Sequence, residues 1–74
     1  MKFSVIQQRI VGSSHLQLTL QTAEKTIEAI AFYVSDEYLQ KTFGEIEIVY
    51  RLAINEFRNT RKPQLIIEEW LKTQ

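Results

Sequence analysis

The sequence predicts a small all-β domain, a closed barrel of five strands with one short helix between the third and the fourth. Nine Ile, four Val and six Thr among 74 residues favour strands, because β-branched side chains fit a pleated sheet better than a helix. Strict alternation of apolar and polar residues over 16–21 is typical of a strand with one buried face. A helix start at Ser35 separates three strand-like segments from two. We therefore expect one domain over residues 1–74.

The first two strands are expected over residues 3–10 and 16–21. In the first, the apolar positions change from odd to even numbers, which predicts a β-bulge. In the second, Leu16, Leu18 and Leu20 point into the barrel and alternate with polar residues.

The third strand is expected over residues 26–34, after a hairpin loop at 22–25. It is apolar on both faces, so its register is the least constrained of the five. We expect Ile30 and Phe32 to point inward, which leaves Ala29, Ala31 and Tyr33 on the outer face beside Gln17 and Thr19.

A short helix is expected after Ser35, whose side chain can accept from the backbone of the first turn. Gly44 is expected to end this helix in the left-handed conformation. Alternation resumes at Glu45 and predicts a long fourth strand with its even-numbered residues from Ile46 to Ile54 on one side. A polar, basic loop at 57–62 then leads to a fifth strand over 64–71, with Pro63 at its start or edge.

Three strands, a helix and two strands form the OB arrangement, and closure of the barrel removes exposed sheet edges. The alternative is an SH3-like barrel, which usually lacks a helix in that position.

The composition excludes several classes of protein. Nine basic and nine acidic residues give zero net charge, which excludes binding of nucleic acid through overall charge. The chain has no Cys, and its apolar runs are too short to span a membrane or to form a signal peptide, so we expect a cytoplasmic protein. The single imidazole and the absence of a glycine-rich phosphate loop argue against catalysis and predict no cofactor or metal in this domain.

The placement of charge is more informative than its sum. Residues 49–63 contain four basic residues and one acidic residue, and in an OB fold most of them fall in the loop between strands four and five. Guanidinium groups bind phosphate oxygens, and aromatic rings stack on bases. The candidate nucleic-acid contacts are Arg51, Arg58, Arg61, Lys62, Phe57, Tyr33, Gln17, Thr19 and His15. The alternatives are a solvated basic turn, Phe57 as a plug at the barrel end, and His15 as an ordinary residue at the start of a strand.

Three segments resemble a known family. HLQLTL at 15–20, EAIAF at 28–32 and VYRLAINEFRNTRKPQLIIEEW at 49–70 are similar to the OB domain of RecJ, the bacterial single-strand-specific DNA exonuclease family, whose signature runs close to YRL-x-[IV]-NEFRG-x-R-x-x-QLIIE. Three positions depart from the family. Ala53 replaces an acid, Asn59 replaces Gly, and Tyr33 stands where an amide or a small residue is usual.

The resemblance implies a single-stranded-DNA-binding module of an enzyme that degrades DNA from the 5′ end in recombination and repair. In that family the domain often closes the chain, and separate catalytic domains hold two divalent metals, Mg²⁺ or Mn²⁺. We accordingly expect a monomeric, non-catalytic module of a longer bacterial chain, with single-stranded DNA and the nuclease domains as its partners. The alternative is a structural or protein-interaction domain that packs against the nuclease core or a partner protein. An independent hydrolase is the least favoured hypothesis.

Overall fold

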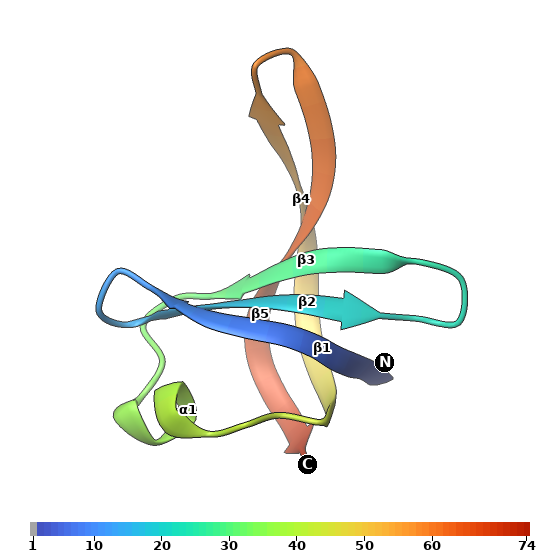
Figure 1. Ribbon diagram of the computed structural model, residues 1–74. Coiled ribbons are helices and arrows are strands. Elements are labelled where there is room, and N and C mark those ends of the chain that lie inside the picture. Colours follow the sequence, from blue (N-terminus) through green and yellow to red (C-terminus); the bar gives the residue numbers. More distant parts are fainter. Residues whose placement is uncertain (1) are drawn as a thin grey trace.

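The computed structural model describes residues 2–74, and for Phe57 it describes the backbone alone. These residues form five strands and one helix that close into a barrel (Figure 1). The elements are β1 (Lys2–Val11), β2 (His15–Gln21), β3 (Thr26–Ala31), α1 (Asp36–Gln40), β4 (Glu45–Phe57) and β5 (Thr60–Thr73). Their order around the barrel is β1-β2-β3-β5-β4, which confirms the predicted OB arrangement.

Two pairings close the barrel. β3 pairs in parallel with β5 through residues 28–30 and 64–66, and β1 pairs with β4 through residues 2–4 and 45–47. β1 also pairs with β2, and its register shifts between Val5 and Gln7. This irregularity confirms the predicted bulge, and it lets one strand bend from β4 to β2.

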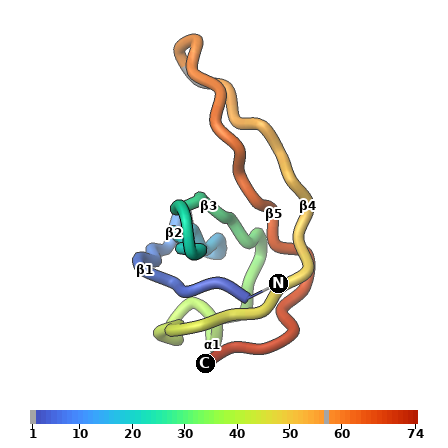
Figure 2. The backbone as a smooth tube through the Cα atoms, turned by 90° about the vertical axis from the view of Figure 1, so that its right-hand side faces the viewer, coloured from blue at the N-terminus to red at the C-terminus, as the bar shows by residue number. Residues whose placement is uncertain are grey.

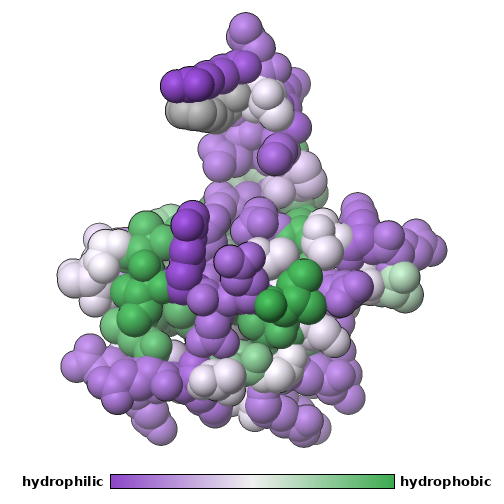
Figure 3. All heavy atoms as spheres, in the orientation of Figure 1, coloured by the Kyte–Doolittle hydropathy of each residue, from purple (hydrophilic) through white to green (hydrophobic). Residues whose placement is uncertain are grey.

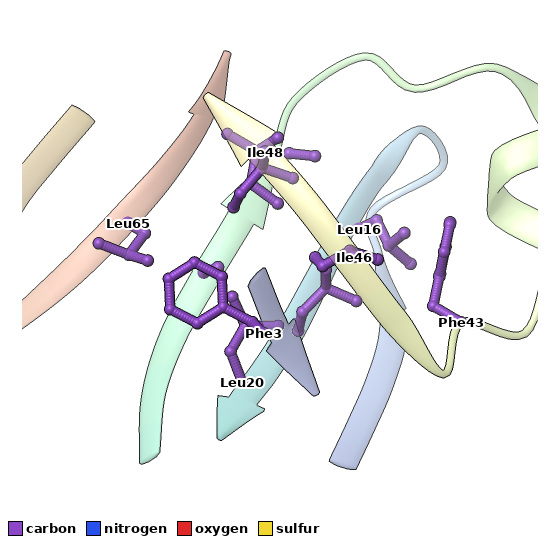
Figure 4. Packing of buried hydrophobic residues seen from close by; sticks show 11 residues of the cluster. Phe3, Leu16, Leu20, Phe43, Ile46, Ile48 and Leu65 are labelled. Carbon is purple, nitrogen blue, oxygen red and sulfur yellow. The ribbon is translucent and has the colours of Figure 1, made fainter. Parts of the chain in front are cut away.

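The interior of the barrel is filled by apolar side chains from all five strands (Figure 4). Leu16, Leu18 and Leu20 of β2 are at most 1% exposed, as their alternation predicted. The remaining buried residues are Phe3, Ala29, Ala31, Phe43, Ile46, Ile48, Leu65 and Ile67. The even-numbered face of β4 therefore begins in the core, as expected.

The predicted register of β3 is wrong. Ala29 and Ala31 are buried, whereas Ile30 is half-buried and Phe32 is exposed beyond the end of the strand. Ala29 pairs with Leu18 and Ala31 pairs with Leu16, and paired residues project to the same face of a sheet. The inward leucines of β2 thus fix the alanines inward, and small side chains fit the space that the leucines leave.

The helix begins as predicted but ends earlier. Ser35 Oγ accepts from the backbone N–H of Tyr38 at 3.4 Å, and Asp36 and Glu37 occupy the first turn. The helix stops at Gln40, and Lys41 caps it in an extended conformation, so Gly44 is not its C-cap. Gly44 instead meets the end of β5, where its N–H donates to the Gln74 carbonyl at 2.5 Å and a Cβ would lie 3.3 Å from that oxygen.

β4 and β5 continue past the barrel as a two-stranded arm, the segment over residues 52–63 (Figure 1, Figure 2). The predicted loop at 57–62 is wrong. Pairing runs to Phe57 opposite Thr60, and only Arg58 and Asn59 form the turn. Pro63 lies in the arm opposite Ile54, one residue before β5 meets β3, which fits its expected place at an edge.

Candidate nucleic-acid interface

The tip of the arm is a tight turn with two left-handed residues. Arg58 has a φ of 51° and Asn59 a φ of 65°. Two-residue hairpins prefer turns in which both central residues have positive φ, because that twist matches the twist of the strands. Asn adopts this conformation more readily than most residues, so Asn59 suits the second position of the turn.

The basic residues of the arm divide between its two faces. Lys62 lies opposite Asn55, whereas the adjacent Arg61 lies opposite Glu56. Neighbours along a strand project to opposite faces, so Arg61 and Lys62 start from opposite faces of the arm. Lys62 and Arg58 are brought together with Asn55 and Thr60 around an open hollow of about 400 Å³. Arg61 shares its face with an acidic residue.

Arg51 lies closer to the barrel than the other three basic residues. Its Nε is 3.5 Å from Oε2 of Glu68, and both side chains are more than half exposed. An exposed ion pair of this kind contributes at most about 1 kcal/mol and is screened by salt. Arg51 therefore remains within reach of a phosphate at little cost. The backbone of Phe57 ends β4, but its side chain lies outside what the structure describes.

A polar face on β1, β2 and β3 holds two further predicted contacts, Gln17 and Thr19. Gln17 Oε1 accepts from Nε and Nη2 of Arg9 at 3.0 and 2.8 Å, and Thr19 Oγ1 donates to Oε1 of Glu28 at 3.2 Å. Together with Gln7 these residues line a shallow hollow of about 240 Å³. Figure 3 shows hydrophilic side chains between two hydrophobic patches on this side of the barrel.

Sequence reasoning missed Arg9, which brings a cation to this polar face. The signal was present in the sequence. After the bulge, the odd-numbered Gln7 and Arg9 come to lie opposite Thr19 and Gln17 in the β1–β2 register.

Two aromatic rings surround His15 at the end of the barrel where β2 starts. The backbone N–H of Tyr33 donates to Nδ1 of His15 at 3.1 Å, and the two rings meet edge to face with centroids 4.9 Å apart. Phe32 contacts His15 in the same way at 5.2 Å. Tyr33 is 83% exposed with a φ of 55°, so it lies past β3 and not on the outer face beside Thr19. Phe32 was missed as a surface residue because it was expected inside.

Within the described residues, no three His, Asp or Glu side chains come close enough to hold a metal ion. No helix in the same part of the chain has the length and apolar character needed to cross a membrane.

Comparison with known families agrees with the OB fold. A family profile described as the RecJ OB domain matches residues 1–69. The chain belongs to the RecJ OB domain family. This RecJ OB domain is 38% identical over 71 residues to the single-stranded-DNA-specific exonuclease RecJ of Dickeya dadantii, and 39% identical over 70 residues to that of Escherichia coli.

The RecJ of Salmonella typhimurium is 34% identical over 71 residues. These alignments cover 89–92% of this chain and 12% of each relative, so the RecJ OB domain spans about one eighth of the proteins that it matches. No solved structure matches it.

Proposed function

We propose that this RecJ OB domain binds single-stranded DNA and positions it for the catalytic domains of a RecJ-type exonuclease. The observation that carries the proposal is the pairing of Arg58 and Lys62 around one hollow at the tip of a projecting arm. The relatives' names state that they act on single-stranded DNA. Guanidinium and ammonium groups on one side of a narrow arm suit a flexible phosphate chain.

The backbone at Arg58 supports a functional role for this residue. A left-handed conformation costs a residue with a Cβ about 1–2 kcal/mol, and Asn or Gly suits the position better. An arginine that occupies such a position against its local preference is a reason to look for function there. The cation is placed at the tip of the arm, where a strand of DNA can approach it.

The proposed binding path runs from the arm tip across the barrel. Arg51 lies between the arm and the barrel, and Tyr33 and His15 form the aromatic end of the path. In this proposal the domain is not itself catalytic, it acts as a monomer in the bacterial cytoplasm, and other domains hold the Mg²⁺ or Mn²⁺ of the full enzyme.

The proposal predicts that a short oligothymidine binds with an affinity that depends on salt, as measured by titration monitored by NMR. If about three phosphates are neutralised, the logarithm of the binding constant should fall with the logarithm of salt with a slope of about −2. Lys62→Gln should reduce this slope by about 0.7, whereas Lys25→Gln in the exposed β2–β3 loop removes the same charge and should leave it unchanged.

Arg58→Asn should weaken binding without lowering the melting temperature, because Asn suits the turn. A slope near zero, or equal effects of Lys62→Gln and Lys25→Gln, contradicts the proposal.

A second candidate function rests on the opposite face of the arm. Leu52 and Ile54 are 61% and 52% exposed, and they lie opposite Leu65 and Pro63. A two-stranded hairpin is marginally stable in water by itself. Figure 2 shows the arm projecting from the barrel, and its apolar face is exposed at Leu52 and Ile54. We propose that this face packs against the nuclease domains of a RecJ-type chain, whose relatives are about eight times as long as the match.

This second function predicts a difference between the domain alone and the domain within a RecJ-type nuclease. In the nuclease, Leu52→Asp should make hydrogen exchange of the arm at least several-fold faster, because a buried contact is lost. In the isolated domain the same change should leave exchange of the arm nearly unaltered, because Leu52 is already exposed there. Leu71→Asp is the matched control, since Leu71 is 51% exposed at the other end of β5. Equal protection of the arm in the Leu52→Asp and Leu71→Asp enzymes would rule out docking through this face.

A further inference from the structure

An aromatic notch opens where β3 and β5 separate. The two strands pair only through residues 28–30 and 64–66, after which the chain turns from β3 toward α1 and β5 continues. The space between them is a hollow of about 250 Å³. We call it the β3–β5 notch, and the residues of its wall that carry the argument are Phe32, Tyr33, Tyr38, Trp70 and Glu68.

The inner wall of the notch is held rigidly. Tyr38 of α1 meets Trp70 of β5 edge to face with centroids 5.2 Å apart, and Trp70 stacks on the buried Phe43 at 5.1 Å. Lys41 Nζ lies 5.6 Å from the centroid of Tyr38 and donates to Thr73 Oγ1 at 2.5 Å. Because these rings hold one another in place, binding of a further ring costs little free energy for ordering the side chains of the site.

The outer wall is open to a ligand. Tyr33 is 83% exposed and Phe32 is 49% exposed, although both belong to residue types that are usually covered. Four aromatic side chains around one hollow are a surface on which a flat ring can stack. The hollow is smaller than the roughly 300–1,000 Å³ pockets of drug-sized ligands, so it suits a single ring system.

Glu68 gives the notch a chemical preference. Its Oε2 lies 3.5 Å from Arg51 Nε, and the guanidinium offsets part of the charge of the carboxylate near DNA. A carboxylate only accepts hydrogen bonds, and the amino groups of cytosine, adenine and guanine donate them. Thymine has no amino group. Its one donor on that edge, the N3–H, lies between two carbonyl oxygens that repel a carboxylate.

We propose that the β3–β5 notch receives one unstacked base of the bound strand and that Glu68 favours bases with an exocyclic amino group. This inference rests on the proposed binding of single-stranded DNA. The basic arm is proposed to contact phosphates, which are the same for every base. The notch would add a preference among bases.

The experiment uses the fluorescence of Trp70, the single tryptophan of the chain, with oligodeoxycytidine and oligothymidine of equal length. Both should bind, the cytidine strand should bind about fivefold more tightly, and it should quench Trp70 more strongly. Glu68→Gln should bring the ratio of the two affinities close to one, because the amide group donates as well as accepts. Tyr33→Asn removes an exposed ring, suits the left-handed backbone, and should weaken binding of both strands about fivefold.

The failures of the two proposals can be told apart. If both strands bind but Trp70 fluorescence does not respond, or if Glu68→Gln leaves their affinity ratio unchanged, the notch proposal is wrong and the proposed function stands. If neither strand binds at low salt, both are wrong. If tetramethylammonium quenches Trp70 and the strands do not, the notch is a cation site and the inference is overturned.

Discussion

Replacing Leu18 by alanine is expected to lower the free energy of unfolding by about 2–5 kcal/mol. Leu18 is 0% exposed and lies between Gln8 of β1 and Ala29 of β3, so its removal leaves a cavity at the centre of the barrel. A core of this size supplies only a few kcal/mol in total, so the variant should be largely unfolded at room temperature. Urea denaturation followed by circular dichroism and by Trp70 fluorescence measures the loss.

Leu52→Ala is the control for that prediction, because it removes the same atoms from a side chain that is 61% exposed on the arm. Its cost should stay within about 0.5 kcal/mol, as is usual for surface substitutions. A loss as large as that of Leu18→Ala would mean that the arm folds onto the barrel in solution, contrary to the structure.

The parts of the fold that could be predicted are those where one local rule acts alone. The alternation at 16–21 has one apolar face, so β2 has one possible orientation. Ser35 followed by Asp36 and Glu37 gives a helix start that no neighbouring segment opposes. The bulge in β1 follows from a change of apolar phase that a regular strand cannot accommodate.

The errors arose where tertiary contacts decide between local alternatives. β3 carries apolar residues on both faces, and only its pairing with the leucines of β2 selects the alanines for the core. Gly44 is suited to a helix C-cap, but the helix ends earlier, and Gly44 instead donates its N–H to the carbonyl of Gln74 at the end of the chain. Residues 57–62 have the composition of a loop, although strand pairing extends through all but two of them.

The candidate site shows the same division. The sequence placed the basic residues in the segment between the last two strands, which is where the arm lies. Sequence reasoning could not assign Arg61 and Lys62 to different faces, because side chains in a loop do not alternate between two faces. In a paired strand, two adjacent residues project to opposite faces. Only Lys62 then shares the hollow of Arg58. The hollow at the arm tip therefore gathers fewer basic residues than the charge count suggested. Arg9 and Phe32, which the sequence reasoning did not include, line other hollows on the barrel.

The register of β3 makes the second large prediction. Ala29→Leu is expected to cost about 1–3 kcal/mol, because Ala29 is fully buried between Leu18 and Leu65 and the barrel has no room for a larger side chain. Ile30→Ala should cost less, since Ile30 is half-buried on the outer face opposite Gln17.

The register predicted from sequence alone reverses this order. It puts Ile30 in the core, where its truncation would cost about 2–5 kcal/mol. It puts Ala29 on the outer face, where a larger side chain would be tolerated. The sign of the difference between the two variants in urea denaturation thus decides which face of β3 is buried. The same measurement bears on the proposed DNA path. With the alanines inward, β3 ends at Ala31, and Phe32 and Tyr33 lie beside His15. With Phe32 in the core instead, the aromatic end of the proposed path could not form.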